Sequence, residues 1–277
     1  MELFGLDILE IVIRLGLGLV IGFCIGLTGV GGGVLMLPAL TLLLKMNSIM
    51  AVGTASLYSF LTKFSATFHH VKLKTIDWTL SLLFLAGALP ANAVVSFWVT
   101  RRGSSAEFQH GLRIFITGTV FFCIGTMVLN LASHIRNQRN RTQGHKLADR
   151  IKARPVLCRT LGVLTGAGIG ALIGATSIGG GVLIIPLLMV LFGLEARRAV
   201  GSSIFIAVTL TLLTSLIYSK AGDTDMVTAV VMAAGSLIGV PSGSRLSVRM
   251  PDKWLQVFMI IPISVAAIMM LFGDGGH

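Results

Sequence analysis

The sequence predicts an all-α membrane protein: a polytopic helical bundle of two inverted-topology repeats, with short broken or re-entrant helices after glycine-rich motifs. Three observations predict it, namely an apolar composition, a series of long apolar runs and an internal repeat. Of the 277 residues, 54% are hydrophobic and only 12% are charged, and the mean hydropathy is +0.89. Soluble domains carry about 25% charged residues, so this chain has too little polar surface to cover a water-exposed globule.

The apolar runs give the expected membrane segments, because crossing the hydrocarbon takes about 20 mostly apolar residues. The candidate spans are 8–28, 50–69, 78–99, 110–131, 159–177, 199–219, 225–246 and 254–272. Two shorter runs, 33–44 and 181–193, each follow a glycine cluster and contain an early proline, Pro38 or Pro186. Proline is tolerated in the first turn of a helix and kinks it further in. We therefore expect these short runs to be half-helices or re-entrant segments.

Lysine and arginine gather in alternate gaps between the runs, which predicts the orientation in the bilayer. The basic gaps hold Lys72 and Lys74, the region 136–154, Arg197 and Arg198, and Arg245 to Lys253. By the positive-inside rule these gaps are cytoplasmic and both termini are extracytoplasmic. The same placement explains the net charge of +11 without nucleic-acid binding. The acidic N-terminus lacks the positive start of a cleaved signal peptide, so the first run is expected to remain in the protein.

An internal repeat divides the chain. Residues 26–38 align without gaps with residues 174–186, an offset of 148 (Gly26 to Gly174), and the match continues downstream from 51–56 to 199–204. It reaches Asp77 and Asp225 at the same offset. Agreement that includes three consecutive glycines and a proline in register is far beyond coincidence.

The repeat predicts the domain organisation and its symmetry. Residues 1–131 form the first repeat, 132–158 a basic cytoplasmic linker and 159–277 the second repeat. Each repeat contains five membrane segments, counting the short one, so the second repeat enters from the opposite side of the membrane. Inverted repeats of this kind underlie alternating access in secondary transporters, with the substrate bound near the midplane where broken helices meet.

The glycine triplets are the predicted binding site. Consecutive glycines let the backbone leave helical geometry, and unwound backbone at membrane depth is tolerated where it lines a cavity or is buried in protein. The first N–H groups of the following half-helix lack intrahelical partners and carry partial positive charge, which suits an anion. The predicted substrate-binding residues are Thr28, Gly31, Gly32, Gly33, Thr54, Ser56, Lys63, Thr176, Ser177, Gly179, Gly180, Gly181, Ser202 and Ser203, with Pro38 and Pro186 as structural residues.

Each of these features has a simpler reading. The triplets could serve helix packing alone, and Lys63 could extend to the cytoplasmic interface rather than face the anion path. The glycine stripes 18–26 and 162–174, spaced every four residues, are expected to be close helix packing. Asp77 and Asp225 are expected to cap helices, and the tryptophans to anchor at the interface. The tryptophans are Trp78, Trp98 and Trp254.

The sequence contains no motif for catalysis. It has no Gly-x-Ser-x-Gly, His-Glu-x-x-His or Walker A pattern, and its three cysteines lack metal-site spacing. We therefore expect neither an enzyme nor a bound metal or cofactor.

The motifs quoted above resemble the TauE/SafE family of sulfite exporters, also called the toluene sulfonate uptake permease family. The resemblance covers nearly the whole chain and rests on the two glycine–proline motifs, the Ala-Val-Gly-Thr/Ser blocks at 51–54 and 199–202, and Ile76-Asp77-Trp78. This sequence departs from the pattern at the end of the first half, where residues 92–102 lack the glycines found at 239–243. The resemblance implies transport of sulfite, sulfonates or related sulfur compounds across the bacterial plasma membrane, driven by an ion gradient.

The leading hypothesis is therefore a secondary carrier that exports a small sulfur oxyanion. An anion channel or passive pore and an uptake permease are the alternatives. The sequence leaves open the exact substrate, the direction, the coupling ion (proton or sodium) and a homodimeric state. Membrane lipid is the expected surrounding partner.

Overall fold

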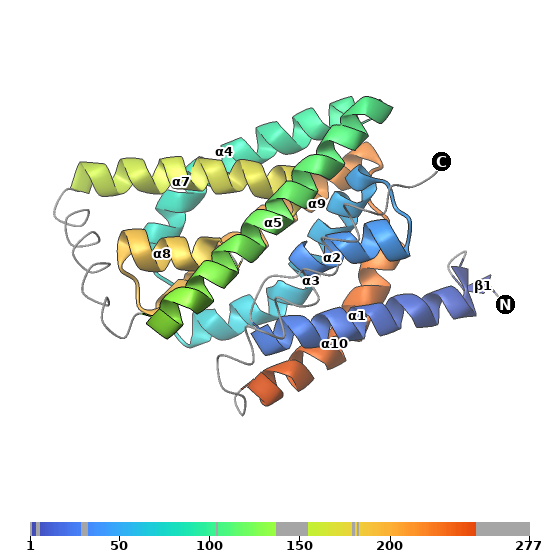
Figure 1. The fold of residues 1–277 in the computed structure, drawn as a ribbon, viewed down its shortest axis with the longest axis horizontal. Coiled ribbons are helices and arrows are strands. Elements are labelled where there is room, and N and C mark those ends of the chain that lie inside the picture. Colours follow the sequence, from blue (N-terminus) through green and yellow to red (C-terminus); the bar gives the residue numbers. More distant parts are fainter. Residues whose placement is uncertain are drawn as a thin grey trace.

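The chain folds into long helices joined by short turns, as seen in a computed structural model (Figure 1). The structure describes residues 2–3, 6–28, 33–103, 105–136, 155–178, 181 and 183–247. The helices are α1 (Ile8–Thr28), α2 (Gly33–Pro38), the π-helix η1 (Ala39–Leu43), α3 (Ser48–Lys72), α4 (Trp78–Arg102), α5 (Ala106–Arg136), α7 (Pro155–Thr176), α8 (Ile184–Phe192), α9 (Ala196–Ala221) and α10 (Met226–Ser247). Two-residue strands, β1 (Glu2–Leu3) and β2 (Leu6–Asp7), pair before α1. Beyond that pair the regular elements of the described residues are helices, which confirms the all-α prediction.

Five of the predicted spans form helices long and apolar enough to cross a membrane: Ile8–Leu27, Trp78–Arg102, Val156–Thr176, Arg197–Ala221 and Met226–Leu246. Their outer faces are apolar, with Leu9, Leu164 and Leu237 exposed by 70%, 67% and 67%. Apolar side chains spread over the outside of several helices are unfavourable in water and are accommodated by lipid tails. The chain is therefore a multi-pass membrane protein.

Two other predicted spans also lie within helices of sufficient length. The run 50–69 lies within the 25-residue α3, and the run 110–131 lies within the 31-residue α5. In α3 the polar residues face inward, since Ser56 and Ser59 are fully buried beside Tyr58. The last predicted span, 254–272, lies outside the described residues.

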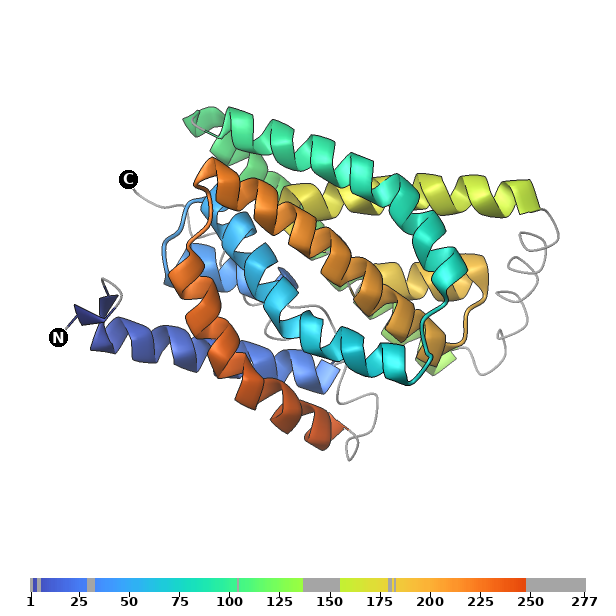
Figure 2. The same ribbon diagram turned by 180° about the vertical axis from the view of Figure 1, so that it is seen from behind.

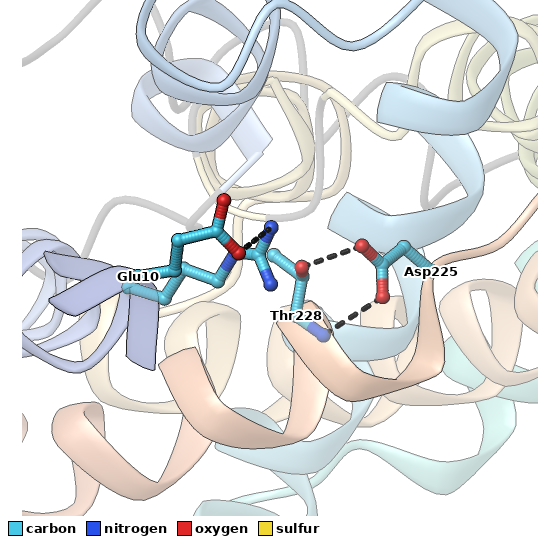
Figure 3. Close-up of polar contacts among 4 residues, drawn as sticks. Glu10, Asp225 and Thr228 are labelled. Atoms are coloured by element: carbon cyan, nitrogen blue, oxygen red, sulfur yellow. Dashed lines mark hydrogen bonds and ion pairs between the residues drawn. The ribbon is translucent and has the colours of Figure 1, made fainter. Parts of the chain in front are cut away.

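Two helices of the bundle begin at the aspartates predicted to cap them. Asp77 Oδ1 accepts a hydrogen bond from the Leu80 N–H at 3.0 Å, and Asp225 Oδ1 accepts one from the Thr228 N–H at 2.9 Å. Asp225 also accepts a 2.6 Å bond from the Thr228 hydroxyl through its second oxygen (Figure 3). These bonds satisfy N–H groups that the first helical turn leaves without partners. The capping prediction is confirmed in α4 and in α10.

Helices distant in sequence form two closely packed pairs, α1 with α10 and α4 with α7. A Cβ on Gly18 or Gly26 would collide with the Met232 or Val240 carbonyl of α10. One on Gly170 would collide with the Ala88 backbone of α4. The prediction that the glycine stripes mediate close helix packing is therefore confirmed, because only glycine lets the backbones approach this closely.

The two pairs run in opposite directions. Contacts advance together along both helices of each pair, so each pair is parallel: Gly18, Gly22 and Gly26 meet Met232, Ser236 and Val240, while Gly166, Gly170 and Gly174 meet Phe84, Ala88 and Asn92. Figure 2 shows α1 and α10 running in one direction and α4 and α7 in the opposite direction. Between the pairs, α3 packs against α9.

Candidate functional site

The two glycine motifs meet in the folded chain. A Cβ on Gly33, the first residue of α2, would collide with the Ser177 carbonyl oxygen and come within 3.3 Å of Ile178 Cα. Ser177 and Ile178 directly follow α7 and belong to the second motif. Gly33 is therefore packed against the backbone of the opposite motif, and the absence of a side chain makes this contact possible.

Short helices follow both motifs, as predicted. α2 is six residues long and continues into the π-helix η1, and Pro38 stands where the α-helical geometry ends. In α8, Pro186 is the third residue, within the first turn, where its missing N–H costs no hydrogen bond. The two prolines therefore have different effects: Pro38 coincides with a change of helix type, whereas Pro186 is accommodated in a regular helix.

Four of the predicted glycines and the side chain of Thr28 fall outside the described residues. Gly31, Gly32, Gly179 and Gly180 lie outside the described residues, and Thr28 is described only as the last residue of α1. Gly33 and Gly181 are buried.

Ser177 has the most unusual environment of the predicted site residues. Its φ is +54°, a left-handed conformation that is uncommon outside glycine, and its N–H donates to the Ile173 carbonyl at 2.7 Å. The residue is 4% exposed, yet its Oγ has no hydrogen-bond partner in the described structure. Buried hydroxyls are nearly always hydrogen-bonded. An unpartnered, strained serine at the meeting point of the two motifs is well suited to bind a ligand.

Its neighbour Thr176 is fully satisfied by the protein. The Thr176 hydroxyl donates to the Leu172 carbonyl at 2.7 Å and accepts from the Ile178 N–H at 3.2 Å. These bonds hold the chain as it leaves α7, so Thr176 shapes the turn on which Ser177 lies.

A polar face runs along α3 towards its C-terminal end. The Ser56 hydroxyl donates to the Val52 carbonyl of its own helix at 2.8 Å. One turn further, Ser59 is fully buried and its Oγ has no partner in the described structure. Lys63 is half-buried; its carbonyl accepts a hydrogen bond from the Thr67 hydroxyl at 3.0 Å, and its ammonium group forms no ion pair with a described residue. A buried hydroxyl without a partner and a half-buried lysine, one turn apart, make this face of α3 polar within the membrane.

Thr54 and Ser202 hold the beginnings of helices from the opposite half. The Asp225 N–H donates to Thr54 Oγ1 at 3.0 Å, and the Asp77 N–H donates to Ser202 Oγ at 2.9 Å. Thr54 and Ser202 are 148 residues apart, as are Asp77 and Asp225, so the two bonds are equivalent in the two halves. Each hydroxyl keeps its own hydrogen available for a further acceptor. The neighbouring hydroxyl of Ser203 donates instead to the Val200 carbonyl of its own helix, α9, at 2.8 Å.

Sequence reasoning missed a buried polar cluster between α4, α7 and α9. Asn92 donates to the Gly170 carbonyl at 3.1 Å and to Thr214 Oγ1 at 2.9 Å, and its own oxygen lies 3.1 Å from that hydroxyl. The Tyr218 hydroxyl donates to the Gly174 carbonyl at 2.9 Å. The sequence did contain a signal for this cluster. Asn92 is a polar amide within an apolar span, and the equivalent residue of the second half is Val240.

Comparisons with known proteins agree with these features. The family model for the sulfite exporter TauE/SafE matches residues 14–270. The chain is 29% identical over 260 residues to the probable membrane transporter protein YjnA of Bacillus subtilis, covering 92% of this chain and 97% of the relative. It is 25% identical over 279 residues to YunE of the same organism (95% and 98%), and 27% identical over 266 residues to a probable membrane transporter protein of Xylella fastidiosa (94% and 95%).

No solved structure matches the chain. The family match covers almost the whole chain, and the named relatives are themselves covered nearly end to end. The apolar helices, the paired glycine motifs and these matches lead to one conclusion: the chain belongs to the TauE/SafE sulfite exporter family of membrane transporters.

Proposed function

We propose that this protein is a secondary transporter that moves a small sulfur-containing oxyanion by alternating access. The observation that carries the proposal is the contact between Gly33 and the Ser177–Ile178 backbone, which joins the glycine motifs of the two halves. Substrates of repeat-built carriers bind where broken helices of both halves meet.

The alternating-access mechanism requires two halves of opposite orientation, and we propose that the repeats are inverted. The reciprocal arrangement of the helices supports this inversion. α1 packs on α10, the equivalent helix α7 packs on α4, and the two pairs run in opposite directions (Figure 2). The bonds Thr54–Asp225 and Ser202–Asp77 repeat the same exchange. Rocking one half against the other would open the junction to each side in turn.

The proposed site holds an anion with dipoles rather than with several fixed charges. The backbone of the glycine motifs, the free hydroxyls of Ser177 and Ser59 and the ammonium group of Lys63 would supply donors. A tetrahedral or pyramidal sulfur oxyanion presents oxygens in several directions, which suits donors from two halves. Dependence on hydroxyl and amide donors also permits release, which a carrier needs. Gly32 and Gly180 belong to the same proposed junction.

The remaining assignments come from the family and the charge pattern. We propose export of sulfite or an organosulfonate from the cytoplasm of a bacterial cell, with both termini on the extracytoplasmic side of the inner membrane. A proton or sodium gradient would drive it. A passive anion pore through the same junction is the competing function, and uptake of a related sulfonate is the competing direction.

Proteoliposome flux tests the proposal. Vesicles containing the purified protein should take up labelled sulfite saturably and show counterflow, with the sulfate anion and the zwitterion taurine as competing test compounds. The Ser177→Ala variant should raise the half-saturation concentration about tenfold, because a hydrogen bond to a charged group contributes about 1.5 kcal/mol. Ser242→Ala is the matched control, since that exposed hydroxyl donates only to the Ile238 carbonyl of its own helix.

The outcomes separate the alternatives. Non-saturable flux without counterflow would replace the carrier with a pore. A correctly inserted Gly32→Leu or Gly180→Leu protein with unchanged binding would remove the glycine junction from the site. A thermal-shift panel of sulfite, thiosulfate, sulfoacetate, taurine and sulfate identifies the preferred oxyanion.

A further inference from the structure

A cleft of about 570 Å³ opens where the beginnings of α4, α7 and α9 meet the end of α8. Its walls are apolar, formed by Leu80, Leu83, Phe192 and Leu194, and its rim carries Arg159 and Arg198. The cleft belongs to the helix ends and shares no described residue with the glycine motifs.

The two arginines of the rim are available to a ligand. Both are exposed, and neither forms an ion pair with a described residue. The cleft also contains two carboxylates, Asp77 and Glu195. Asp77 is engaged in capping α4, whereas Glu195 is exposed at the rim and makes no capping bond.

The surrounding end of the molecule is basic. Arg197 lies beside Arg198, and the turn that follows α3 brings Lys72 and Lys74 to the same end, because its Thr75 packs against Gly201 of α9. Lys72, Lys74 and Arg197 are all exposed. Five cations against two carboxylates leave an excess of positive charge around the cleft.

The outer faces of the adjoining helices are apolar and directed to lipid. Trp78 at the start of α4 is 47% exposed, and Val156 near the start of α7 is 72% exposed. Leu82 and Leu157 continue this surface on the same two helices. A molecule in the cleft would therefore have cations at its rim and hydrocarbon-compatible walls beside and beneath it.

We propose that this cleft binds the headgroup of an anionic phospholipid. Guanidinium groups match phosphate oxygens in geometry and charge, and basic pockets between membrane helices at the cytoplasmic side recruit anionic headgroups. The charge pattern of the sequence assigns this end of the molecule to the cytoplasm. The acyl chains would lie along the exposed faces of α4 and α7.

The two arginines of the rim have no counterparts in the first half of the chain. At the equivalent positions of the first half, 148 residues earlier, Ile11 stands in place of Arg159 and Met50 in place of Arg198. The repeat therefore provides these two arginines in the second half only. A lipid site in a single leaflet follows from this difference.

Lipid titration of the detergent-purified full-length chain tests the proposal. Phosphatidylglycerol should bind in native mass spectrometry and raise the unfolding temperature more than phosphatidylcholine does. The double variant R159Q/R198Q should weaken the apparent affinity for phosphatidylglycerol about 30-fold, because each arginine near an anionic headgroup contributes about fivefold. The variant K45Q/K220Q is the control, since it removes the same charge from exposed positions outside the cleft.

The outcomes are distinct. Equal loss in both double variants would show a general charge effect and overturn the site. Equal protection by inorganic phosphate would make it a free-anion site and overturn the lipid assignment. Unchanged affinity in R159Q/R198Q would overturn the proposal altogether, whatever the flux experiments find, because lipid binding is measured without transport.

Discussion

The pair α1–α10 and the pair α4–α7 are equivalent in the repeat but bring their backbones together by different means. In α1–α10 both helices contribute glycines: Gly18, Gly22 and Gly26 face α10, while Gly235, Gly239 and Gly243 face α1. In α4–α7 the stripe of α7 faces a helix with Gly87 alone, and α4 adds Asn92 and Ser96, which donate to carbonyls of α7. The α1–α10 pair is therefore stabilised by close backbone contact, and the α4–α7 pair also by buried hydrogen bonds.

The difference has a physical basis. Removing side chains from both helices increases van der Waals contact, which drives association in lipid where the hydrophobic effect is absent. An amide that reaches a carbonyl across the interface instead fixes register through direction and distance. Asn92 additionally ties α9 to this pair through Thr214, so the second pair is coupled to the centre of the bundle.

The largest effect is expected from adding one methyl group to the α1–α10 pair. A Cβ on Gly22 would lie 2.7 Å from both Cα and Cβ of Ser236. Gly22→Ala should therefore lower the free energy of unfolding by about 3 kcal/mol, as overpacking of a tight interface does. Gly16→Ala is the control, because that position has no atom within 4 Å. Thermal unfolding in detergent measures both, and equal stability of the two variants would contradict the packing account.

A smaller effect is expected when the α4–α7 pair is made to resemble its equivalent. Asn92→Val introduces the residue found at 240 and removes the bonds to Gly170 and Thr214. The loss should be about 2 kcal/mol, since the Thr214 hydroxyl is left buried without a partner. Adding Thr214→Ala, the residue found at 66, should recover part of this loss. Strict additivity of the two changes in thermal unfolding would show that the residues do not interact.

The reciprocal hydrogen bonds between the halves should contribute about equally. Thr54→Val and Ser202→Ala each remove the acceptor of one helix-start N–H, and each should cost about 1 kcal/mol. Ser203→Ala serves as the control, because its hydroxyl donates to Val200 within the same helix. Chemical unfolding of the purified variants measures the three values. A large cost at one site and none at the other would break the equivalence of the halves.

The smallest effect concerns the turn between α9 and α10, where Asp223 occupies the position of Thr75. Burial raises the pKa of the Asp223 carboxyl, so its charged form is disfavoured in the folded protein. Wild-type stability therefore falls as the pH rises through the folded pKa. Asp223→Asn should slightly raise the unfolding temperature at pH 7, and the gain should vanish below the pKa of the unfolded carboxyl. A gain that persists there, or one shared by the exposed Asp7→Asn control, would exclude this cause.

Local signals were sufficient for much of the fold. Apolar runs located the spans because a helix that crosses the hydrocarbon needs about 20 mostly apolar residues. Asp77 and Asp225 marked helix starts because capping is a contact over three residues. The glycine stripes marked packing faces. None of these signals named a partner, so the pairing of α1 with α10 rather than with a neighbour in sequence could not be read from them.

The candidate site was predictable only in outline for the same reason. The motifs pointed to Ser177, but its left-handed φ and its unpartnered hydroxyl depend on how Gly33 packs against it. Thr54 and Ser202 were predicted as ligands of the substrate, and their bonds to Asp225 and Asp77 span 171 and 125 residues. Such contacts depend on the tertiary arrangement of all the helices between them.

The sequence by itself determined that the chain enters a membrane, where its helices begin, and that its two halves repeat. These properties follow from hydropathy, caps and glycine spacing, which act within one helix or along one chain segment. Only the tertiary structure decided which helices pair, which hydroxyls are already engaged, and where unsatisfied polar groups remain. Those outcomes depend on complementarity between surfaces far apart in sequence, and the energy of each contact exists only once the other helices hold it in place.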